Sequence, residues 1–319
     1  VDSVPHQGHY TQDEIRAIVA YATERFITIV PEIDIPGHSS AMLAAFPEFG
    51  CTGGPYNVQP YWGIHKDILC AGNPGTLPFL ENIFSEILDL FPSQYIHTGG
   101  DEVPKTRWQQ CPKCQVLARD LNYSSVSHLQ TYLANYLNSF LHKNGRSMVG
   151  WNEVLADDLS PDVVVHYWMG NKKTLISHME RGRKVILSNY QAYYLDHTYT
   201  HSSLSRVYQF EPVFPQLDFG LHDQILGIEA PLWTEYVPSR PRLDWQTFPR
   251  LLAVAEIAWL GTKKENYPHF KQRLKGFLPE LDNAEILYAP LSAANPNFIH
   301  RLNGPISLLQ ENTHVRSEQ

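Results

Sequence analysis

The stretch from His97 to Glu102, with the sequence HTGGDE, is the part of this 319-residue chain best suited to chemistry, because it ends in two adjacent carboxylates. Tyr95 and Ile96 before it predict a short strand, and the paired glycines allow backbone angles that would strain other residues. The alternation of side chains can therefore break, so that Asp101 and Glu102 face one cleft. Two close carboxylates do not both ionise easily, which predicts a proton donor beside an acid that stays charged. The alternative is an acidic cap at a helix start.

The four cysteines, Cys51, Cys70, Cys111 and Cys114, allow three disulfide pairings or one four-thiolate metal site, and the sequence does not choose between them. Cys111 and Cys114 have half of a zinc-knuckle spacing, but Cys51 and Cys70 lie far apart in the sequence. Buried thiols or a loop-closing disulfide are therefore favoured over zinc. We predict no metal and no cofactor, and the chain has no glycine-rich phosphate loop.

The composition excludes several classes of partner. A chain that is 43% hydrophobic and 18% charged is long enough for one large domain with a substantial core. Its formal charge of -8 and the absence of a lysine or arginine block argue against nucleic acid. No apolar run reaches the roughly 20 residues that span a bilayer, and residues 1–5 lack the regions of a signal peptide. We predict no membrane partner and see no targeting segment.

Helices alternate with short strands in the predicted secondary structure. Thr11 and Glu14 form a capping-box pattern, and the apolar spacing that follows predicts a helix to about Arg25. The β-branched segment Ile27 to Ile33 predicts a buried strand covered on both faces. Helical spacing also recurs over residues 80–91, 129–140 and 175–179. Five more strands are predicted at Tyr95, Ser147 to Trp151, Val163 to Trp168, Lys184 to Ser188 and Ile225 to Ala230.

Six strands that alternate with helices fit either a doubly wound sheet or a βα barrel. Polar or aromatic residues follow every predicted strand: Asp34, Asp101 with Glu102, Trp151, Trp168, Tyr194 with Asp196, and Trp233 with Glu235. A site built from the ends of all strands is typical of a barrel. We therefore predict an α/β fold of the TIM type, an incomplete (β/α) barrel of six strands instead of eight. It occupies residues 1–290, and residues 291–319 form an irregular C-terminal extension.

Taken together, the ordered motifs resemble the β-N-acetylhexosaminidases of glycoside hydrolase family 20. These motifs are Pro31 to His38, His97 to Glu102, Gly150 to Glu153, Tyr167-Trp168, Tyr194 to Asp196 and Leu232 to Glu235. The resemblance covers the chain from about Tyr10 to about Pro290. It implies a TIM barrel and a hydrolase that removes terminal β-linked N-acetylglucosamine or N-acetylgalactosamine from glycans or chitin-derived oligosaccharides.

The resemblance also implies catalytic roles. Glu102 would be the general acid and base, and Asp101 would orient the 2-acetamido group of the sugar. The carbonyl oxygen of that group would attack its own anomeric carbon, which gives an oxazolinium intermediate and retention of configuration. Tyr194 would donate its hydroxyl to the acetamido oxygen. Asp34 and His38 would form a pair whose imidazole approaches Glu102 and tunes its proton affinity.

Five further residues would bind the substrate by the same resemblance. Trp151, Trp168 and Trp233 would wall a pocket around the acetamido methyl group. Asp196 and Glu235 would accept hydrogen bonds from sugar hydroxyls distant from the cleaved bond. We interpret His97, which precedes the glycines, as a supporting or core histidine.

The chain begins in the helix before what resembles the third strand of the eight-stranded family barrel. We therefore expect the first two βα units to be absent, together with an arginine that clamps sugar hydroxyls. Open edges are prone to aggregation, so we expect a second copy or another polypeptide to cover them. The alternative function is a catalytically impaired remnant that binds acetamido sugars, although the retained acids favour an enzyme. A secreted, periplasmic or lysosomal-like location is favoured over the cytoplasm.

Overall fold

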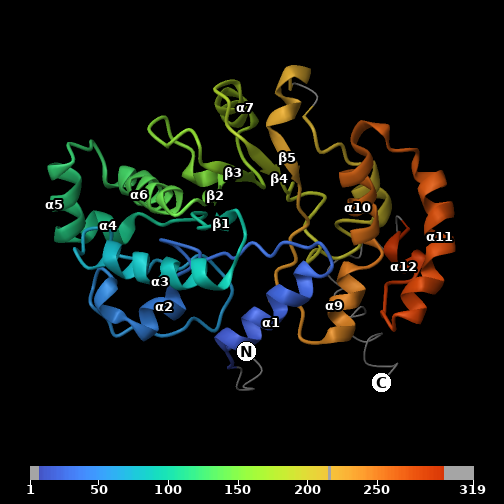
Figure 1. The fold of residues 1–319 in the computed structure, drawn as a ribbon, viewed down its shortest axis with the longest axis horizontal. Helices are drawn as coiled ribbons and strands as arrows, with labels where there is room; N and C mark the ends of the chain where they lie inside the picture. Colours follow the sequence, from blue (N-terminus) through green and yellow to red (C-terminus); the bar gives the residue numbers. More distant parts are fainter. Residues whose placement is uncertain (1–6, 215–216, 298–319) are drawn as a thin grey trace. The chain divides into compact units, whose positions relative to one another are not determined.

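The computed structural model describes residues 7–214 and 217–297, which Figure 1 traces as helices joined to short strands. The chain divides into two compact units. The first unit runs to His166 and also includes Asn171–Lys184. The second unit comprises Tyr167–Gly170 and the chain from Val185 onward. Each unit is described by itself below.

The first unit contains seven helices and the strands β1 to β3, of which the last residue belongs to the second unit. Its elements are α1 (Gln12–Thr23), α2 (Ser40–Ala45), α3 (Thr76–Leu90), β1 (Tyr95–His97), α4 (Thr106–Gln110), α5 (Pro112–Asp120), α6 (Leu129–Lys143), β2 (Ser147–Trp151), β3 (Val164–Tyr167) and α7 (Lys172–Glu180). The predicted capping box of α1 is confirmed. The Thr11 hydroxyl accepts the N–H of Glu14 at 3.2 Å, and the Glu14 carboxylate accepts the N–H of Thr11 at 2.7 Å. Two N–H groups at the helix start are thereby satisfied.

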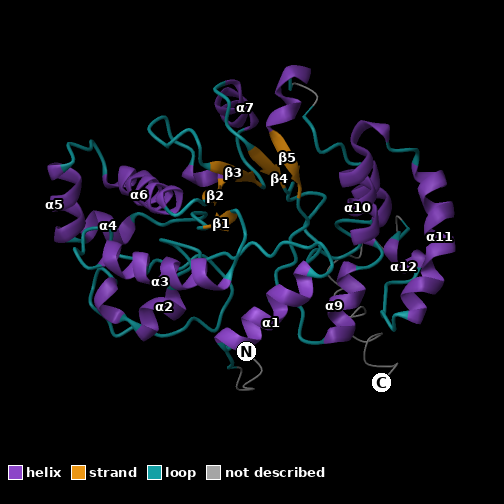
Figure 2. Ribbon diagram, in the orientation of Figure 1, coloured by secondary structure: helices purple, strands orange, loops and turns teal. Residues whose placement is uncertain are grey.

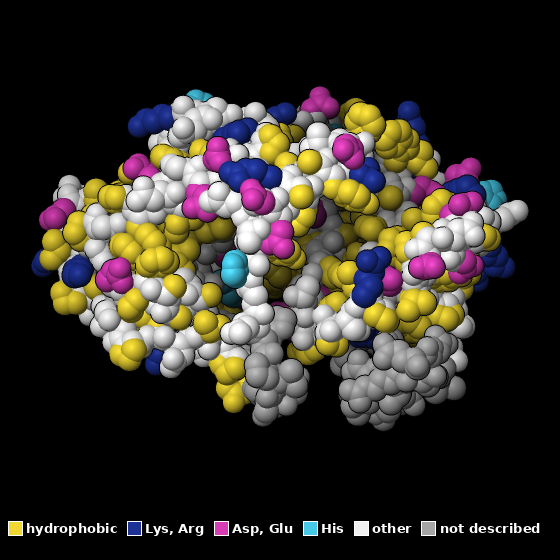
Figure 3. All heavy atoms as spheres, turned by 60° about the horizontal axis from the view of Figure 1, so that its bottom comes forward, with side chains coloured by type: hydrophobic (Ala, Val, Ile, Leu, Met, Phe, Trp, Pro, Cys, Tyr) yellow, Lys and Arg dark blue, Asp and Glu magenta, His cyan; other side chains and the backbone are white. Residues whose placement is uncertain are grey.

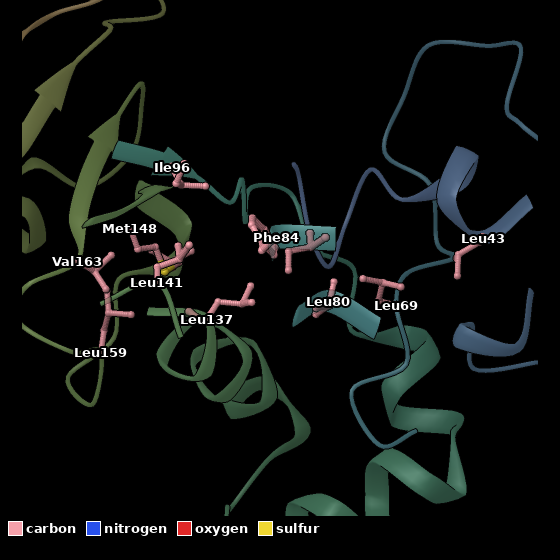
Figure 4. Packing of buried hydrophobic residues seen from close by; sticks show 13 residues of the cluster. Leu43, Leu69, Leu80, Phe84, Ile96, Leu137, Leu141, Met148, Leu159 and Val163 are labelled. Atoms are coloured by element: carbon pink, nitrogen blue, oxygen red, sulfur yellow. The ribbon is translucent and has the colours of Figure 1, made fainter. Parts of the chain in front are cut away.

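The apolar core of the first unit lies between its helices and its strands (Figure 4). Leu80 and Phe84 of α3, Leu137 and Leu141 of α6, and Met148 of β2 are at most 1% exposed. Each large apolar side chain buried in this way contributes about 1.5–3 kcal/mol. This packing fixes β1 and β2, and the acidic residues follow β1 directly.

The second unit has its own core, built mainly by helices. Its elements are β4 (Val185–Leu187), α8 (Leu204–Gln209), β5 (Ile225–Ile228), α9 (Arg240–Thr247), α10 (Arg250–Leu260), α11 (Tyr267–Asn283) and α12 (Leu291–Ala294). α8 packs against α10 and α11, and Tyr208 stacks on Phe270 with ring centroids 4.3 Å apart. α12 occupies the start of the extension predicted at 291–319, and residues 298–319 lie outside the described residues.

The strands form one sheet in the order β1-β2-β3-β4-β5, drawn in orange in Figure 2. β1 pairs with β2, β2 with β3, and β4 with β5, all in parallel. Parallel strands in chain order, with helices between them, are the arrangement of a βα barrel. Within the described residues the sheet does not close, so β1 and β5 are its first and last strands.

The predicted strand from Ile27 to Ile33 is wrong as a regular buried strand, so the structure has five named strands rather than six. The segment pairs with β1 through a single parallel bridge at Glu32. Pro31 has no N–H group to donate to a longer ladder. Ile27 and Val30 are 58% and 43% exposed, so no described residue covers the outer part of this segment.

The surface carries charges of both signs. On the face drawn in Figure 3, basic and acidic side chains are interspersed among apolar ones. In the described part of the chain, no helix combines the length and the apolar character needed to cross a membrane.

Candidate active site

Three neighbouring backbone segments of the first unit end together beyond β1. The N–H of Ile35 donates to Thr98 O at 3.1 Å, and the N–H of Trp151 donates to Gly99 O at 2.9 Å. The segment 33–38, the HTGGDE turn (residues 97–102) and the end of β2 therefore lie side by side. The sequence predicted functional residues in each of these three segments, and the structure brings the three segments together.

The HTGGDE turn depends on its two glycines. Gly99 and Gly100 have φ angles of +67° and +101°, which confirms the predicted departure from ordinary strand geometry. A Cβ atom on Gly99 would lie 1.8 Å from Oδ1 of Asp34, and one on Gly100 would lie 2.4 Å from the side chain of Val154. The glycines therefore provide both the turn and the space that the Asp34 carboxyl fills.

Asp34 and Asp101 form a pair of interacting carboxyls. The N–H of Gly100 donates to Asp34 Oδ1 at 2.9 Å. Burial, followed by the charge of Asp101, raises the pKa of Asp34 to about 10. Burial alone would raise the pKa of Asp101 too, but hydrogen bonds from His38 and Asp34 and the His38 charge hold it below its ordinary value. The structure thus gives Asp101 a protonated partner in Asp34, and the pairing of Asp34 with His38 stays a prediction.

His38 contacts both acids of the HTGGDE turn. Its Nε2 lies 3.5 Å from Oδ2 of Asp101 and 3.4 Å from Oε2 of Glu102. Hydrogen bonding to Asp101, together with the charges of Asp101 and Glu102, raises the pKa of His38 despite its partial burial. His38 and Glu102 both have left-handed φ angles, +47° and +48°, at a cost of about 1–3 kcal/mol each. The structure therefore holds between two acids an imidazole whose charged form they favour.

Trp151 is fixed by three residues of the first unit. Its indole N–H donates to Glu32 Oε1 at 2.9 Å, and its ring stacks on His166 with centroids 4.2 Å apart. His97 packs against both rings and lies 3.3 Å, nitrogen to nitrogen, from His166. Burial, followed by the charge of His97, lowers the pKa of His166 to about 2, so that this ring is neutral. Trp151 is only 3% exposed, and its orientation is set from several sides.

The second unit brings two of its predicted residues together. Trp168 follows β3 and stacks on Tyr194 with ring centroids 6.0 Å apart. Tyr190 contacts both rings edge to face, at 5.8 Å and 5.2 Å. The N–H of Tyr190 donates to Trp168 O at 2.9 Å, which ties the two loops. These three rings form an aromatic cluster of which the sequence analysis named two members.

Asp196, Trp233 and Glu235 also meet in the second unit. The N–H of Trp233 donates to the Asp196 carboxylate, and the charge of Glu235 acts on the same group. Burial is the largest cause that raises the pKa of Asp196 to about 6, and Glu235 adds to it. The Trp233 side chain is 41% exposed, so within this unit part of its indole ring remains open to solvent.

Arg250 holds the loop that carries these residues. Its guanidinium is fully buried and donates to Leu195 O at 2.5 Å, His197 O at 2.8 Å and Ser202 O at 3.1 Å. Gln246, one turn earlier, donates to Asp196 O at 2.8 Å. Two side chains of the α9–α10 region thus fix the backbone on both sides of the Asp196 carboxyl.

Comparison with known families accounts for this arrangement. The family model described as "Glycosyl hydrolase family 20, catalytic domain" matches residues 2–262. The chain belongs to glycosyl hydrolase family 20. The resemblance found in the sequence is thereby confirmed, and so is the fold class, a TIM-type βα architecture whose sheet is open in the described residues.

Several curated relatives in family 20 are similar over most of this chain. A beta-hexosaminidase of Porphyromonas gingivalis is 35% identical over 298 residues, which are 90% of this chain and 38% of that protein. A beta-hexosaminidase of Vibrio furnissii is 38% identical over 268 residues, which are 78% of this chain and 43% of that protein. The chain therefore spans less than half the length of these two relatives.

Solved structures of family 20 share the fold. A chitobiase of Flavobacterium johnsoniae has a TM-score of 0.81 at 34% identity, over 91% of this chain and 45% of that one. An exo beta-N-acetylglucosaminidase of Vibrio harveyi, solved with N-acetylglucosamine, has a TM-score of 0.80 at 31% identity, over 90% of this chain and 47% of that one.

Four residues around the candidate site were missed or assigned no role: Glu32, His166, Tyr190 and Arg250. Glu32 had a signal, because it precedes Asp34 by two positions along an extended segment, where side chains point the same way. His166 lies on β3, directly before Tyr167 and Trp168, and Tyr190 lies within the Tyr194 loop. Arg250 had no signal, because an arginine inside a helix is ordinarily exposed.

Proposed function

We propose that this chain is the catalytic part of a retaining exo-glycosidase that removes terminal β-linked N-acetylglucosamine or N-acetylgalactosamine with the help of the substrate's own acetamido group. The observation that carries this proposal is the contact of one imidazole, His38, with both Asp101 and Glu102 at the end of β1 of a family 20 domain. The Vibrio harveyi structure with N-acetylglucosamine supports the substrate class.

Glu102 is the proton donor in this scheme. Its protonated carboxyl gives a proton to the glycosidic oxygen as the bond from that oxygen to the anomeric carbon breaks, and the aglycone leaves as an alcohol. The acetamido carbonyl oxygen forms a bond to the anomeric carbon in the same step. A water molecule then attacks that carbon, and the bond from the carbon to the acetamido oxygen breaks, which restores the amide. The Glu102 carboxylate takes one proton from the attacking water.

Asp101 keeps its charge throughout, because its pKa is held below the ordinary value. An ionised carboxylate accepts the acetamido N–H and offsets the positive charge that grows on that group, which contributes several kcal/mol in a preorganised site. Protonated Asp34 and the His38 imidazole keep this carboxylate in place. Both are therefore positioning residues for Asp101 and Glu102.

Six of the residues named from the family resemblance bind the sugar in this proposal. The Tyr194 hydroxyl donates to the acetamido oxygen, and the indoles of Trp151, Trp168 and Trp233 contact the acetamido methyl group. Asp196 and Glu235 accept hydrogen bonds from hydroxyl groups, a recognition that rejects sugars lacking them. The pairing of Trp168 with Tyr194 and of Asp196 with Trp233 and Glu235 supports these roles.

We also propose that a second copy or another polypeptide covers the apolar side chains of α1 and the segment after it. Ile18, Tyr21, Phe26 and Ile27 are all between 42% and 100% exposed. Exposed apolar groups gathered in this way mark interaction sites. Light scattering of the purified chain tests this, and a well-behaved monomer at micromolar concentration contradicts it.

The activity itself is tested with an aryl β-N-acetylglucosaminide. Glu102→Gln removes the transferable proton at constant size, so kcat falls by about 10²-fold or more. Glu86→Gln, which changes an exposed acid on α3, leaves the rate unchanged. A native chain that binds a thiazoline analogue of the intermediate but hydrolyses nothing is instead the sugar-binding remnant. Efficient cleavage of glucosides without an acetamido group contradicts substrate assistance.

A further inference from the structure

All four cysteines of the chain lie together in the first unit, apart from the proposed reaction. Sγ of Cys70 lies 3.7 Å from Sγ of Cys111 and 3.6 Å from that of Cys114, and Sγ of Cys51 lies 3.9 Å from that of Cys114. All four sulfur atoms lie within 4.8 Å of one another. The separation of Cys51 from Cys70 in the sequence, which argued against a metal, is therefore overcome by the fold.

We propose that the four cysteines bind one zinc ion as thiolates. Zn–S bonds of about 2.3 Å in a tetrahedron place the sulfur atoms about 3.8 Å apart, close to the three separations above. A disulfide requires about 2.05 Å instead, and Cys70 lies equally near two possible partners, so no pair is singled out. Four sulfur ligands leave no open position, which is typical of a structural zinc site.

The backbone around the sulfurs suits anionic ligands. Cys111 precedes α5, and Cys114 lies in the first turn of that nine-residue helix, where the helix dipole favours thiolates. The N–H of Gly72 donates to the sulfurs of Cys70 and Cys114. A Cβ atom on Gly72 would lie 2.3 Å from the carbonyl carbon of Lys113, so only glycine lets the two loops approach this closely.

The segments that carry the sulfurs are also held by hydrogen bonds that do not involve the metal. The N–H of Cys70 donates to Phe49 O at 2.7 Å, which places the Cys70 segment beside the segment that leads to Cys51. The indole of Trp108 donates to Leu69 O at 2.8 Å. The ligands are therefore preorganised, and zinc binding displaces four thiol protons to solvent without a large rearrangement.

The burial of the four cysteines determines how easily a bound metal ion could exchange with solvent. Cys70, Cys111 and Cys114 are at most 4% exposed, and Cys51 is partly exposed. The metal would thus be reached from the Cys51 side and shielded elsewhere. It would tie the loop before α3 to α4 and α5, the helices that follow Glu102. Its role is to hold the loops around the proposed acid, and it takes no part in the reaction.

The native chain, purified without chelator, tests the site directly. Metal analysis should find one zinc ion per chain, and a mercurial thiol reagent should release the zinc in step with loss of the thiolates. Replacement by cobalt should give the visible absorption of a tetrahedral cobalt thiolate. Four free thiols without metal, a mass reduced by two hydrogens per disulfide, or bound iron in place of zinc would each overturn the proposal.

Two variants separate ligand loss from loss of packing. Cys114→Ser should weaken zinc binding by more than the roughly 100-fold that loss of an outer-shell partner costs. Leu129→Ala, which makes a cavity in the same apolar cluster, should lower the melting temperature while the folded protein retains its zinc. Equal zinc loss in both variants, or unchanged affinity in Cys114→Ser, would refute the four-thiolate site. Neither readout depends on glycosidase activity.

Discussion

The two units hold their proposed site residues by different physical means. In the first unit, Asp34, Asp101 and Glu102 are placed by the backbone itself, through a turn of left-handed residues and a carboxyl seated against Gly99. In the second unit, the loop that carries Tyr194 and Asp196 is held by side chains from a distant helix region, above all by Arg250. The first arrangement depends on the backbone conformation of residues 97–102 and on Asp34 seated against it, and the second depends on side-chain hydrogen bonds across some 50 positions of the chain.

The difference predicts how each region fails. A strained turn with no spare space should not tolerate one added methyl group, although the core beneath it remains packed. A loop tied by hydrogen bonds to one cation should lose stability when that cation is removed. The first change should displace side chains of the turn, and the second should lower the free energy of unfolding.

The largest effect is expected for Gly99→Ala. The new methyl group would meet Oδ1 of Asp34 at 1.8 Å, so either the carboxyl or the HTGGDE turn must move away from Asp101. Displacement of the acids by about 1 Å costs about 10²-fold in rate. We therefore expect kcat/KM for an aryl N-acetylglucosaminide to fall by at least that factor.

Gly145→Ala is the matched control for this change. Gly145 has a similar φ angle of +70°, but a Cβ atom there would meet nothing within 4 Å. It should cost about 1 kcal/mol of stability from backbone strain and leave kcat/KM unchanged. If both variants lose activity equally, the contact of Asp34 with Gly99 is not what positions the acids.

The second unit should respond most to Arg250→Met. Methionine fills much of the space but leaves the carbonyls of Leu195, His197 and Ser202 without their donors. Each buried acceptor without a partner costs about 1–3 kcal/mol. The free energy of unfolding in urea should fall by about 3 kcal/mol or more.

Arg273→Met provides the comparison for that loss. Arg273 is 46% exposed and forms ion pairs with Glu265, which is 53% exposed, and with Glu256, which is 19% exposed. Pairs of this kind contribute about 0.2–1 kcal/mol. A similar loss of stability in the two variants would mean that Arg250 has no special role in the second unit.

The same contrast explains what could be read from the sequence. The HTGGDE turn and the helices α1, α3 and α6 were predictable because glycine angles, capping pairs and apolar spacing are local properties. The strand before Asp34 was overpredicted, since its β-branched residues satisfy the strand pattern whether or not another segment covers them. Pairing and burial are properties of neighbours that a single segment does not reveal.

Contacts between distant positions were beyond the sequence argument. The proton shared by Asp34 and Asp101 depends on a close approach that Gly99 permits, and a list of acids does not show it. The four cysteines come together through contacts of distant segments. The antiparallel bridge of Gly50 with Leu69 places the Cys51 and Cys70 segments side by side, and Gly72 approaches Lys113. In the sequence, Arg250 cannot be distinguished from an exposed helical arginine. The structure shows that its guanidinium lies among backbone carbonyl groups.

A carboxyl from each unit can also be compared by the dependence of stability on pH. The pKa of Asp34 is raised from 3.8 to about 10, and that of Asp196 from 3.8 to about 6. In both cases the folded chain keeps a proton that the unfolded chain releases. Stability therefore falls as pH rises from the unfolded pKa, 3.8, to the folded pKa, and this pH range is the window of the residue. Asparagine has no such proton, so each Asn variant should gain stability relative to the native chain within the window of the residue it replaces.

The two windows end at different pH values, and this difference is the test. For Asp196→Asn, the difference in unfolding free energy from the native chain should stop growing near pH 6, where Asp196 is ionised in both states. For Asp34→Asn, it should keep growing from about pH 6 to about pH 9, because the folded Asp34 still holds its proton. Urea unfolding at several pH values measures both curves. If the Asp34→Asn curve also levels off near pH 6, the carboxyl is ionised in the folded chain, and the protonated partner assigned to Asp101 is wrong.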